Sequence, residues 1–376
     1  MLSYWERTSL KTFDVIVIGS GITGLSTAIS LKEKKPHLSV AVVERGVLPT
    51  GASTRNAGFA CIGSAGEIAD DLQKSTEDEV LQLVSLRLQG LQMLRKRLGD
   101  ENIRYRENGS YELIAEQELD VLEKVDSLNN LLKPVTGKKT FEVLSNESFS
   151  FSKEHTKAII QNHCEGELHT GEMMKHLHQF ALQKGIVVFT GCEVESIEDN
   201  STCTVNVKRN LNNETVAFNC KKVVLCTNAF TPKFFPQLDI QPGRGLVLIT
   251  KPIANHPFKG IYHFEKGYYY FREIDGRVLF GGGRNEDFET ESTSDFSTNE
   301  KIHASLMEKL PHIILPSVKF EIDMHWTGIM AFGKNKKPLI EWAGENVLLA
   351  ARIGGMGVAI GSMAGETAAN YIIEKF

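Results

Sequence analysis

Residues Val15–Ser26 read VIVIGSGITGLS, and this stretch decides the fold of the chain. A mostly β-branched run, Phe13–Ile18, ends directly at a glycine, which predicts a fully buried strand. Three glycines then match the pattern G-x-G-x-x-G, and apolar residues follow at helical spacing. A second apolar strand, SVAVVE (39–44), completes a β-α-β unit of the size expected for a right-handed parallel crossover. The sequence therefore predicts a Rossmann-like dinucleotide-binding domain.

Each glycine of the motif has its own physical task. Gly19 makes the tight turn, Gly21 lets the backbone approach a pyrophosphate, and Gly24 allows the helix to pack closely on the strand. Ile22 and Thr23 open the helix, where free N–H groups and the helix dipole favour the negative charge of the phosphates.

The acidic residue Glu44 follows at the end of the second strand. A carboxylate about twenty residues beyond the motif is placed to accept hydrogen bonds from the ribose hydroxyls of an adenosine. NAD and FAD enzymes share this opening, so the motif alone leaves the dinucleotide open. The next segment, 44–63, is a polar, glycine-rich loop instead of another helix, which favours a larger ligand than NAD.

Length and composition set the remaining bounds. A chain of 376 residues exceeds the size at which one core usually stops growing, so two domains are expected. The net charge is −5 and no segment concentrates Lys or Arg, which argues against a nucleic-acid partner. The six cysteines form no Cys-x-x-Cys pair and the histidines form no metal-like cluster, so no metal site is expected. With neither a signal-peptide pattern nor an apolar membrane span, we expect a cytoplasmic protein.

The rest of the chain predicts an α/β plus α+β fold with a discontinuous first domain. Asn108-Gly109 signals a hairpin between strands near Tyr105 and Tyr111, and Thr170 is placed to cap a helix. Short strands dominate after Gly185, and the chain ends as strand, glycine turn and helix. The expected FAD-binding domain comprises 1–65, 160–235 and 326–376, and the expected mostly antiparallel substrate domain comprises 66–159 and 236–325.

Seven segments, in order along the chain, carry a family resemblance: IGSGITGLS, VVERG, GASTRNAGF, VVLCTNAF, RVLFGGGR, HWTG and RIGGMGV. Together they resemble the D-amino-acid-oxidase-type family of FAD-dependent oxidoreductases, which includes glycine and sarcosine oxidases. The SYWE segment before the first strand and the GAS-x-RN-x-G loop are most similar to the γ-glutamylputrescine oxidoreductase branch.

The resemblance implies a set of FAD-binding residues in four groups. The first holds the pyrophosphate, the second lies along the adenosine side, the third runs beneath the phosphate and flavin, and the fourth meets the flavin ring. In that order they are Gly19, Gly21, Ile22, Thr23 and Gly24; Glu44, Arg45, Val194, Thr227 and Asn228; Gly51, Ala52, Ser53, Arg55, Asn56, Ala57 and Gly58; and Gly328, Gly354, Gly355, Met356, Gly357, Val358 and Ala359.

The resemblance also implies the chemistry. Hydride leaves a carbon that bears an amine and passes to flavin N5, which gives an imine that water hydrolyses. The expected substrate is a small amine or amino acid, and the electron acceptor is oxygen or another compound. Two alternatives stay open: an NAD(P)-dependent dehydrogenase, and a flavin-binding protein without amine turnover.

Two departures from the family pattern bear on cofactor and substrate. Met330, in WTGIMA (326–331), stands where glycine and D-amino-acid relatives have the arginine that clamps the substrate carboxylate. Leu279 stands where sarcosine oxidase-like relatives have a lysine that activates oxygen, and no cysteine lies near HWTG to bind FAD covalently. We therefore expect non-covalent FAD and leave the oxygen reactivity open.

Four residues are the candidates for the substrate side. Strand alternation puts Tyr270 and Arg272 on one face, with Tyr269 and Phe271 on the other. Arg244 and Trp326 complete the candidates. The structural alternatives are a sheet-surface position for Arg272, a salt bridge for Arg244 and a core position for Trp326. Arg352, before the glycine turn, is an alternative carboxylate anchor.

Overall fold

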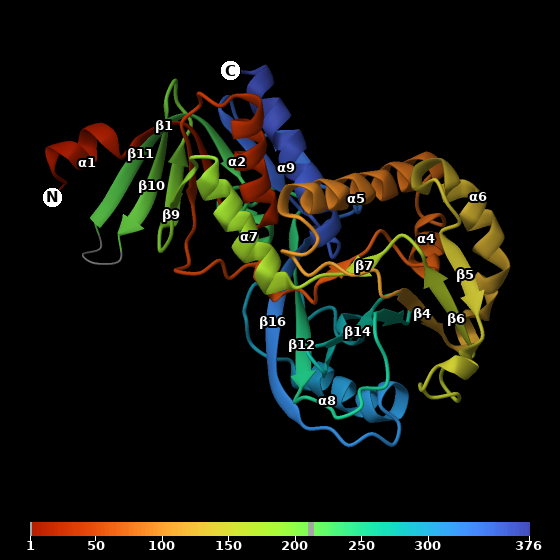
Figure 1. Ribbon diagram of the computed structural model, residues 1–376. Coiled ribbons are helices and arrows are strands. Elements are labelled where there is room, and N and C mark those ends of the chain that lie inside the picture. Colours follow the sequence, from red (N-terminus) through yellow and green to blue (C-terminus); the bar gives the residue numbers. More distant parts are fainter. Residues whose placement is uncertain (1, 210–213) are drawn as a thin grey trace.

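The computed structural model describes residues 2–209 and 214–376. Two eight-stranded sheets form the body of the molecule, and a two-stranded sheet accompanies them. In Figure 1 the first sheet and its helices occupy the upper part, and the second sheet lies below them. The small sheet pairs β3 (Phe59–Ala60) with β7 (Gly166–Glu167).

The first sheet has a parallel core built from three separate parts of the chain. Its strand order is β17-β18-β11-β1-β2-β8. The bounds are Leu339–Trp342 for β17, Val347–Ala351 for β18, Glu214–Leu225 for β11, Thr12–Ile18 for β1, Val40–Val43 for β2 and Val187–Phe189 for β8. Only β17 runs antiparallel to its neighbour in this order. The strands β9 (Glu193–Glu198) and β10 (Cys203–Arg209) extend β11 as an antiparallel flap.

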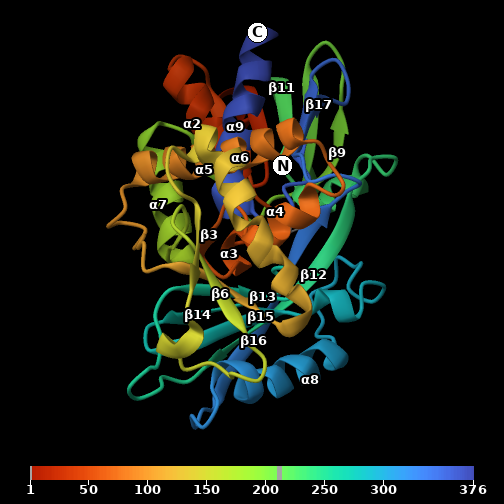
Figure 2. The same cartoon turned by 90° about the vertical axis from the view of Figure 1, so that its right-hand side faces the viewer.

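The second sheet is mostly antiparallel, with the order β16-β12-β15-β14-β13-β4-β6-β5. The bounds are Ile322–Phe332 for β16, Gln241–Thr250 for β12, Arg277–Gly282 for β15, Tyr269–Ile274 for β14, Ile261–Phe264 for β13, Ser110–Ile114 for β4, Ala158–Asn162 for β6 and Phe141–Leu144 for β5. One pair, β13 with β4, is parallel. The aromatic residues of β13 to β15 make its buried face, which α8 (Glu300–Lys309) and the π-helical turn Leu310–Ile314 cover (Figure 2).

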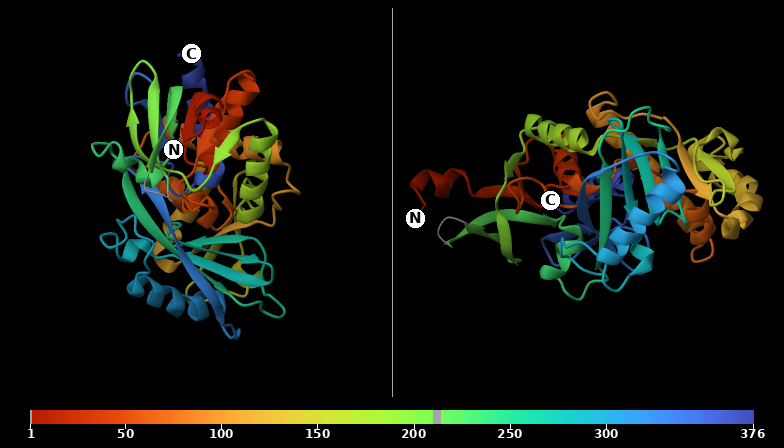
Figure 3. Two further views of the ribbon diagram at one scale, coloured as in Figure 1. Left: turned by 90° about the vertical axis from the view of Figure 1, so that its left-hand side faces the viewer. Right: turned by 90° about the horizontal axis from the view of Figure 1, so that it is seen from below.

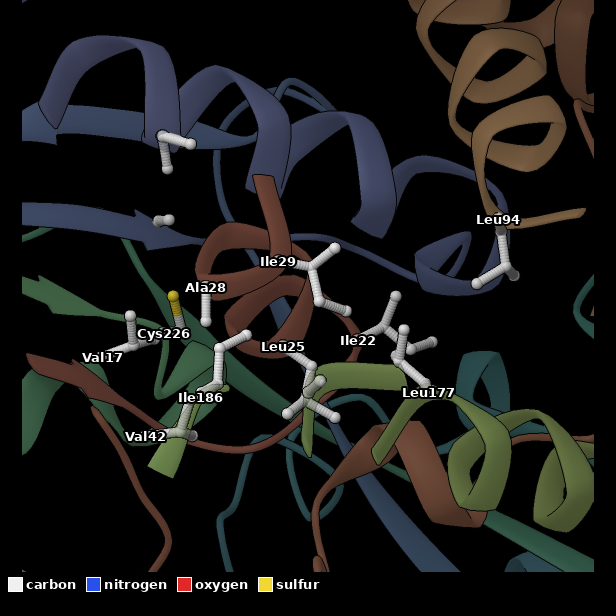
Figure 4. Packing of buried hydrophobic residues seen from close by; sticks show 14 of the residues in the cluster. Val17, Ile22, Leu25, Ala28, Ile29, Val42, Leu94, Leu177, Ile186 and Cys226 are labelled. Atoms are coloured by element: carbon white, nitrogen blue, oxygen red, sulfur yellow. The ribbon is translucent and has the colours of Figure 1, made fainter. Parts of the chain in front are cut away.

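Helices α2 (Ile22–Lys34), α7 (Thr170–Gln183) and α9 (Gly357–Glu374) cover one face of the first sheet. In Figure 4, Leu25 and Ile29 of α2 lie among side chains from the sheet and from α7. The long helix α5 (Glu77–Leu98) crosses α9 and leads toward α6 (Val125–Thr136), which follows the 3-10 helix η1 (Glu116–Lys124). Along the chain, the short helices α3 (Ala52–Arg55) and α4 (Ala65–Asp71) follow β2 and precede β4.

The first helix, α1 (Tyr4–Ser9), projects from the body. It contains no buried residue, and Tyr4 and Trp5 are exposed. Both panels of Figure 3 show the two sheets, and the right-hand panel shows α1 standing apart from them.

Most predicted elements form, and two local predictions are wrong. The turn signal at Asn108-Gly109 makes no hairpin, because β4 pairs with β13 and β6 and Tyr105 lies outside any strand. The side chain of His169, not Thr170, caps α7, and the Thr170 hydroxyl instead donates to Asn56. The predicted domain boundaries stay a prediction; those at 160 and 326 fall inside β6 and β16, which both belong to the second sheet.

Candidate active site

A single cavity of about 1340 Å³ runs from the carboxyl end of β1 to the space beside the second sheet. Its wall includes the glycine motif, the loop 51–57, the turn 353–358 and residues of β12, β13, β14 and β16. Ordinary small-molecule pockets hold roughly 300–1000 Å³, so this volume suits a dinucleotide together with a second, smaller molecule.

The glycine motif forms a cradle that larger side chains would fill. Gly19 has φ +105°, and a Cβ there would lie 2.7 Å from the carbonyl oxygen of Cys226. A Cβ on Gly21 would lie 2.8 Å from Ser53 Oγ, and a Cβ on Gly24 would overlap the carbonyl of Gly19. Gly19 and Gly24 therefore allow the tight turn and the close packing that the motif predicts, and Gly21 leaves room for the Ser53 hydroxyl.

The end of the cavity beside β2 is organised by Glu44. Its carboxylate accepts hydrogen bonds from the backbone and hydroxyl of Ser20 at 3.0 and 2.9 Å, and from the backbone N–H of Gly46 at 3.0 Å. These bonds fix the carboxylate at the carboxyl end of β2, where it lines the cavity. Arg45 follows and stacks its guanidinium over Phe230, 3.8 Å from the ring centre.

The loop 51–58 is held from both sides. The Ser53 hydroxyl accepts from the backbone N–H of Ile22 at 3.0 Å, which ties the loop to the glycine motif. Arg55 donates to the carbonyl of Thr327 at 2.8 Å, and Trp326 Nε1 donates to the carbonyl of Arg55 at 3.0 Å. The loop is thus fixed to α2 on one side and to β16 on the other.

The glycines of the turn before α9 and those of α9 itself have two different tasks. Gly354 has φ +68°, and at Gly354, Gly355 and Gly357 an added Cβ would meet no atom closer than 3.6 Å, so this part is open to the cavity. At Gly361 and Gly365, by contrast, a Cβ would come within 2.8 and 2.7 Å of residues of α2. The first group can approach a ligand, and the second lets two helices touch.

The cavity brings together nearly all the residues predicted to bind the cofactor. All of them line it except Gly24, Gly58 and Ala359. Gly24 packs against β1, a Cβ on Gly58 would overlap the carbonyl of Leu168, and the carbonyl of Ala359 contacts Gly90 of α5. The assignment of individual contacts to FAD stays a prediction.

Of the four residues predicted for the substrate side, one lines the cavity and three do not. Tyr270 lines the cavity, and its burial raises the pKa of its hydroxyl to about 12, so the hydroxyl keeps its proton. Arg244, Arg272 and Trp326 are not among the lining residues. Arg244 forms a buried ion pair with Glu291, and Arg272 donates to the carbonyls of Ala57, Gly58 and Leu168. The alternative anchor Arg352 reaches the wall but pairs with Asp239 at 2.9 Å.

Among the lining residues that the sequence did not predict are Cys61, Glu67, Arg87, His263 and Arg284. Cys61, Glu67, Arg87 and His263 lie outside the seven quoted segments, whereas Arg284 ends the segment RVLFGGGR, whose resemblance gave it no role. Burial lowers the pKa of His263, which keeps the imidazole neutral, and its Nε2 lies 3.6 Å from Cys61 Sγ.

Glu165 joins Cys61 and His263 in a buried group whose ligand atoms all lie within 4.8 Å of one another. The Glu165 carboxylate already accepts from the backbone N–H groups of Ile62 and Gly63 and from the hydroxyl of Ser110. Burial raises the pKa of the Cys61 thiol well above its ordinary value, which disfavours the thiolate that binds metals. The hydrogen bonds of Glu165 hold the loop that follows β3.

The parallel sheet, the glycine cradle and the long cavity define a dinucleotide-binding oxidoreductase, and three features fit FAD. The glycine motif and the start of α2 line the cavity, the carboxylate of Glu44 lies at the end of β2, and a glycine turn at the start of a helix meets the far end. The model of the FAD dependent oxidoreductase (DAO) family matches residues 14–371. The chain belongs to this family and is an FAD-dependent oxidoreductase, which decides the alternative between FAD and NAD(P).

Comparisons with individual proteins give matches of the same kind. The chain is 26% identical to gamma-glutamylputrescine oxidoreductase of Escherichia coli, over 96% of this chain and 84% of the relative. It is 24% identical to the probable oxidoreductase OrdL of Haemophilus influenzae, over 97% and 84%. The solved structure of glycine oxidase from Geobacillus kaustophilus has the same fold, with a TM-score of 0.78, 19% identity, and 97% and 96% of the two chains covered. Among the residues that the structure describes, no helix has the length and apolarity to span a bilayer.

Proposed function

We propose that this enzyme oxidises the carbon–nitrogen bond of a small amine or amino acid, using FAD that is held non-covalently. One observation carries the proposal: the cofactor cradle and the chamber beside Tyr270, His263 and Met330 belong to one continuous cavity. When bound, FAD supplies the hydride acceptor, flavin N5, and the product imine is hydrolysed by water.

The side chains of the chamber orient the substrate and control its protons. The Tyr270 hydroxyl has no hydrogen-bond partner within the described part of the chain, so it is free to donate to a substrate group. Burial keeps the imidazole of His263 neutral, so it adds no charge to the chamber. The uncharged form of the amine has the nitrogen lone pair that is needed to release hydride. Phe59 and Tyr270, whose ring centres are 5.5 Å apart, supply an apolar wall that excludes water.

The cofactor is held by shape and hydrogen bonds in this proposal. The open backbone at Gly354–Gly357 lies at the start of α9, where N–H groups suit the negative charge that develops on a reduced flavin. Acid precipitation of the holoenzyme is expected to release all of the flavin into the supernatant. Flavin that stays with the precipitate would contradict the non-covalent assignment.

The decisive experiment is a substrate screen on the purified holoenzyme without oxygen. Polyamines, γ-glutamyl amines, N-methyl amino acids and D-amino acids are added in turn, and the oxidised-flavin absorbance is followed. We expect one class to bleach the flavin, and readmission of oxygen then reports whether oxygen is the acceptor. A holoenzyme that no amine or amino acid bleaches would instead support a flavin-binding protein without amine turnover. The cytoplasmic location stays a prediction.

A further inference from the structure

Arg284 lies at the cavity without a partner for its charge. It begins the 3-10 turn η4 (Arg284–Glu286) directly after β15, and its side chain lines the cavity. Within residues 2–209 and 214–376, its guanidinium has no hydrogen bond and no ion pair, and its Nε is buried. A buried donor without an acceptor is costly, so this group is matched to an acceptor that the chain does not contain.

Glu291 is the acid whose charge acts most on Arg284, but its carboxylate already binds Arg244. Its carboxylate binds Arg244 through Nε at 3.2 and 3.1 Å and through Nη2 at 2.6 Å, and it also accepts from Asn299 at 3.0 Å. Both partners of this ion pair are almost fully buried. Arg244 thus neutralises Glu291 and leaves the positive charge of Arg284 to the cavity.

The position of the guanidinium is fixed by its surroundings. It stacks 4.3 Å from the ring centre of Phe332 and 5.1 Å from that of Phe288. Its Cζ lies over Gly243, where an added Cβ would be only 2.9 Å away. A glycine near the start of β12 therefore makes the room that this side chain uses.

Gly243 connects Arg284 with the position of the missing family arginine. In the sheet, Gly243 is the cross-strand partner of Met330. Met330 reaches the glycine turn, because a Cβ on Gly355 would lie 4.0 Å from its Sδ. The guanidinium of Arg284 therefore lies one strand away from residue 330, on the wall of the same cavity.

Five other basic residues at this end of the cavity have acidic partners. Arg87 and Lys336 pair with Glu67, Lys337 with Glu79, Lys74 with Asp70, and Arg352 with Asp239. Lys334 lines the rim and is exposed to solvent. Arg55 also lines the cavity without an acidic partner, but its guanidinium donates to the carbonyls of Thr50 and Thr327. Arg284 is thus the cavity-lining arginine at this end whose guanidinium bonds to no described residue.

We propose that Arg284 binds a carboxylate of the substrate, and that the enzyme acts on an amine that carries a carboxylate group. The planar guanidinium offers paired N–H donors that match a carboxylate, and the two aromatic rings hold its plane. The substrate class rests on the proposed function, whereas the carboxylate site itself is testable without turnover.

The test compares benzoate with benzamide, which has nearly the same shape but no charge. Binding to the holoenzyme is measured by titration calorimetry for wild type, Arg284→Gln, Arg284→Lys and Lys334→Gln. We expect wild type to bind benzoate at least tenfold more tightly than benzamide. Arg284→Gln removes this preference, Arg284→Lys keeps part of it, and Lys334→Gln, which removes one charge from the rim, changes the benzoate affinity less than twofold. Unfolding midpoints of all four proteins show that each variant is folded.

Two results would overturn the inference: equal benzoate affinity in wild type and Arg284→Gln, or no preference of wild type for benzoate over benzamide. An equal loss in Lys334→Gln would assign the effect to the general field of the cavity and would overturn it too. The anaerobic substrate screen fails or succeeds independently, so an Arg284-dependent benzoate site with no bleaching substrate would contradict the proposed function alone.

Discussion

The Tyr270 hydroxyl is the polar group of the chamber whose contribution can be isolated most cleanly. Its ring packs with Phe59 and Trp326, and its hydroxyl bonds to no described residue. The ring therefore belongs to the structure, whereas the hydroxyl is available to a ligand.

Replacing Tyr270 by Phe is expected to slow flavin bleaching by the identified substrate about 3- to 10-fold, because one substrate hydrogen bond contributes about 0.5–1.5 kcal/mol. The free energy of unfolding stays within about 0.5 kcal/mol of wild type, since no intramolecular bond is lost. Stopped-flow bleaching and urea denaturation measure the two quantities.

Tyr262→Phe is the matched control. The Tyr262 hydroxyl donates to the carbonyl of Lys259 at 2.7 Å, and its ring lies in the core of the second sheet. This variant is expected to lose about 1 kcal/mol of stability and to bleach at the wild-type rate. If Tyr270→Phe instead lost stability and bleached at the wild-type rate, the Tyr270 hydroxyl would be structural.

At the level of elements, β14 and the loop 51–58 are joined by Arg272. Its guanidinium donates to three backbone carbonyls, at 3.3 Å for Ala57, 3.2 Å for Gly58 and 2.8 Å for Leu168. The sequence placed Arg272 correctly on the face of Tyr270, but the side chain holds the cofactor loop instead of facing the cavity. It is a positioning residue.

Arg272→Met is expected to weaken FAD binding about tenfold or more, because the loop loses its anchor and three carbonyls lose their donor. Arg277→Met is the control: Arg277 lies on the neighbouring strand β15 and pairs with Asp323, away from the loop. Fluorescence titration of the apoproteins with FAD measures both. Unchanged FAD affinity in Arg272→Met would contradict the anchoring role.

Helices α2 and α9 depend on Gly365 for their close approach. A Cβ at this residue would lie 2.7 Å from the Thr23 carbonyl and from Ser26 Cβ. Gly365→Ala is therefore expected to lower the free energy of unfolding by about 1–3 kcal/mol, despite the better helix propensity of Ala.

Gly171→Ala in α7 is the control, since its Cβ would meet only the imidazole of His169, at 3.2 Å. Urea denaturation should leave that variant within about 0.5 kcal/mol of wild type or slightly above it. A Gly365→Ala protein as stable as wild type would show that the helices separate at little cost.

For the molecule as a whole, the buried carboxyl of Glu112 makes stability depend on pH. Glu112 lies in β4, and its carboxyl group accepts from the hydroxyl of Ser64 and the backbone N–H of Gly66, both at 2.9 Å. Burial raises the pKa of Glu112 from its ordinary value of 4.5 to about 7. Between these two values the folded state binds more protons than the unfolded state, so this group's contribution is lost as pH rises.

Glu112→Gln removes the ionisation. Relative to wild type, the variant is expected to gain about 1–3 kcal/mol of stability between pH 5 and pH 8, since one pKa unit corresponds to 1.36 kcal/mol. Urea denaturation at both pH values gives the difference, and Glu116→Gln, at an exposed position of the η1 helix, is the comparison. A stability difference between Glu112→Gln and wild type that does not change with pH would contradict the raised pKa.

The sequence by itself determined the β-α-β unit, the glycine cradle, Glu44 and the final glycine turn. These features are local: strand, turn and helix preferences act within a few residues, and the motif needs particular residue types at fixed spacing. Nearly every residue predicted for the cofactor consequently lies on one cavity.

The tertiary structure alone decided which residues face the substrate end of the cavity and which are paired elsewhere. Arg244 meets Glu291, Arg272 meets the loop 51–58, and Arg284 is left without an acid, because each outcome depends on residues far apart in the chain. Whether an arginine is paired or buried depends on which sheets and turns pack against it. The same arginine type therefore becomes an ion pair, a loop anchor or a free cation, and no local pattern distinguishes the three.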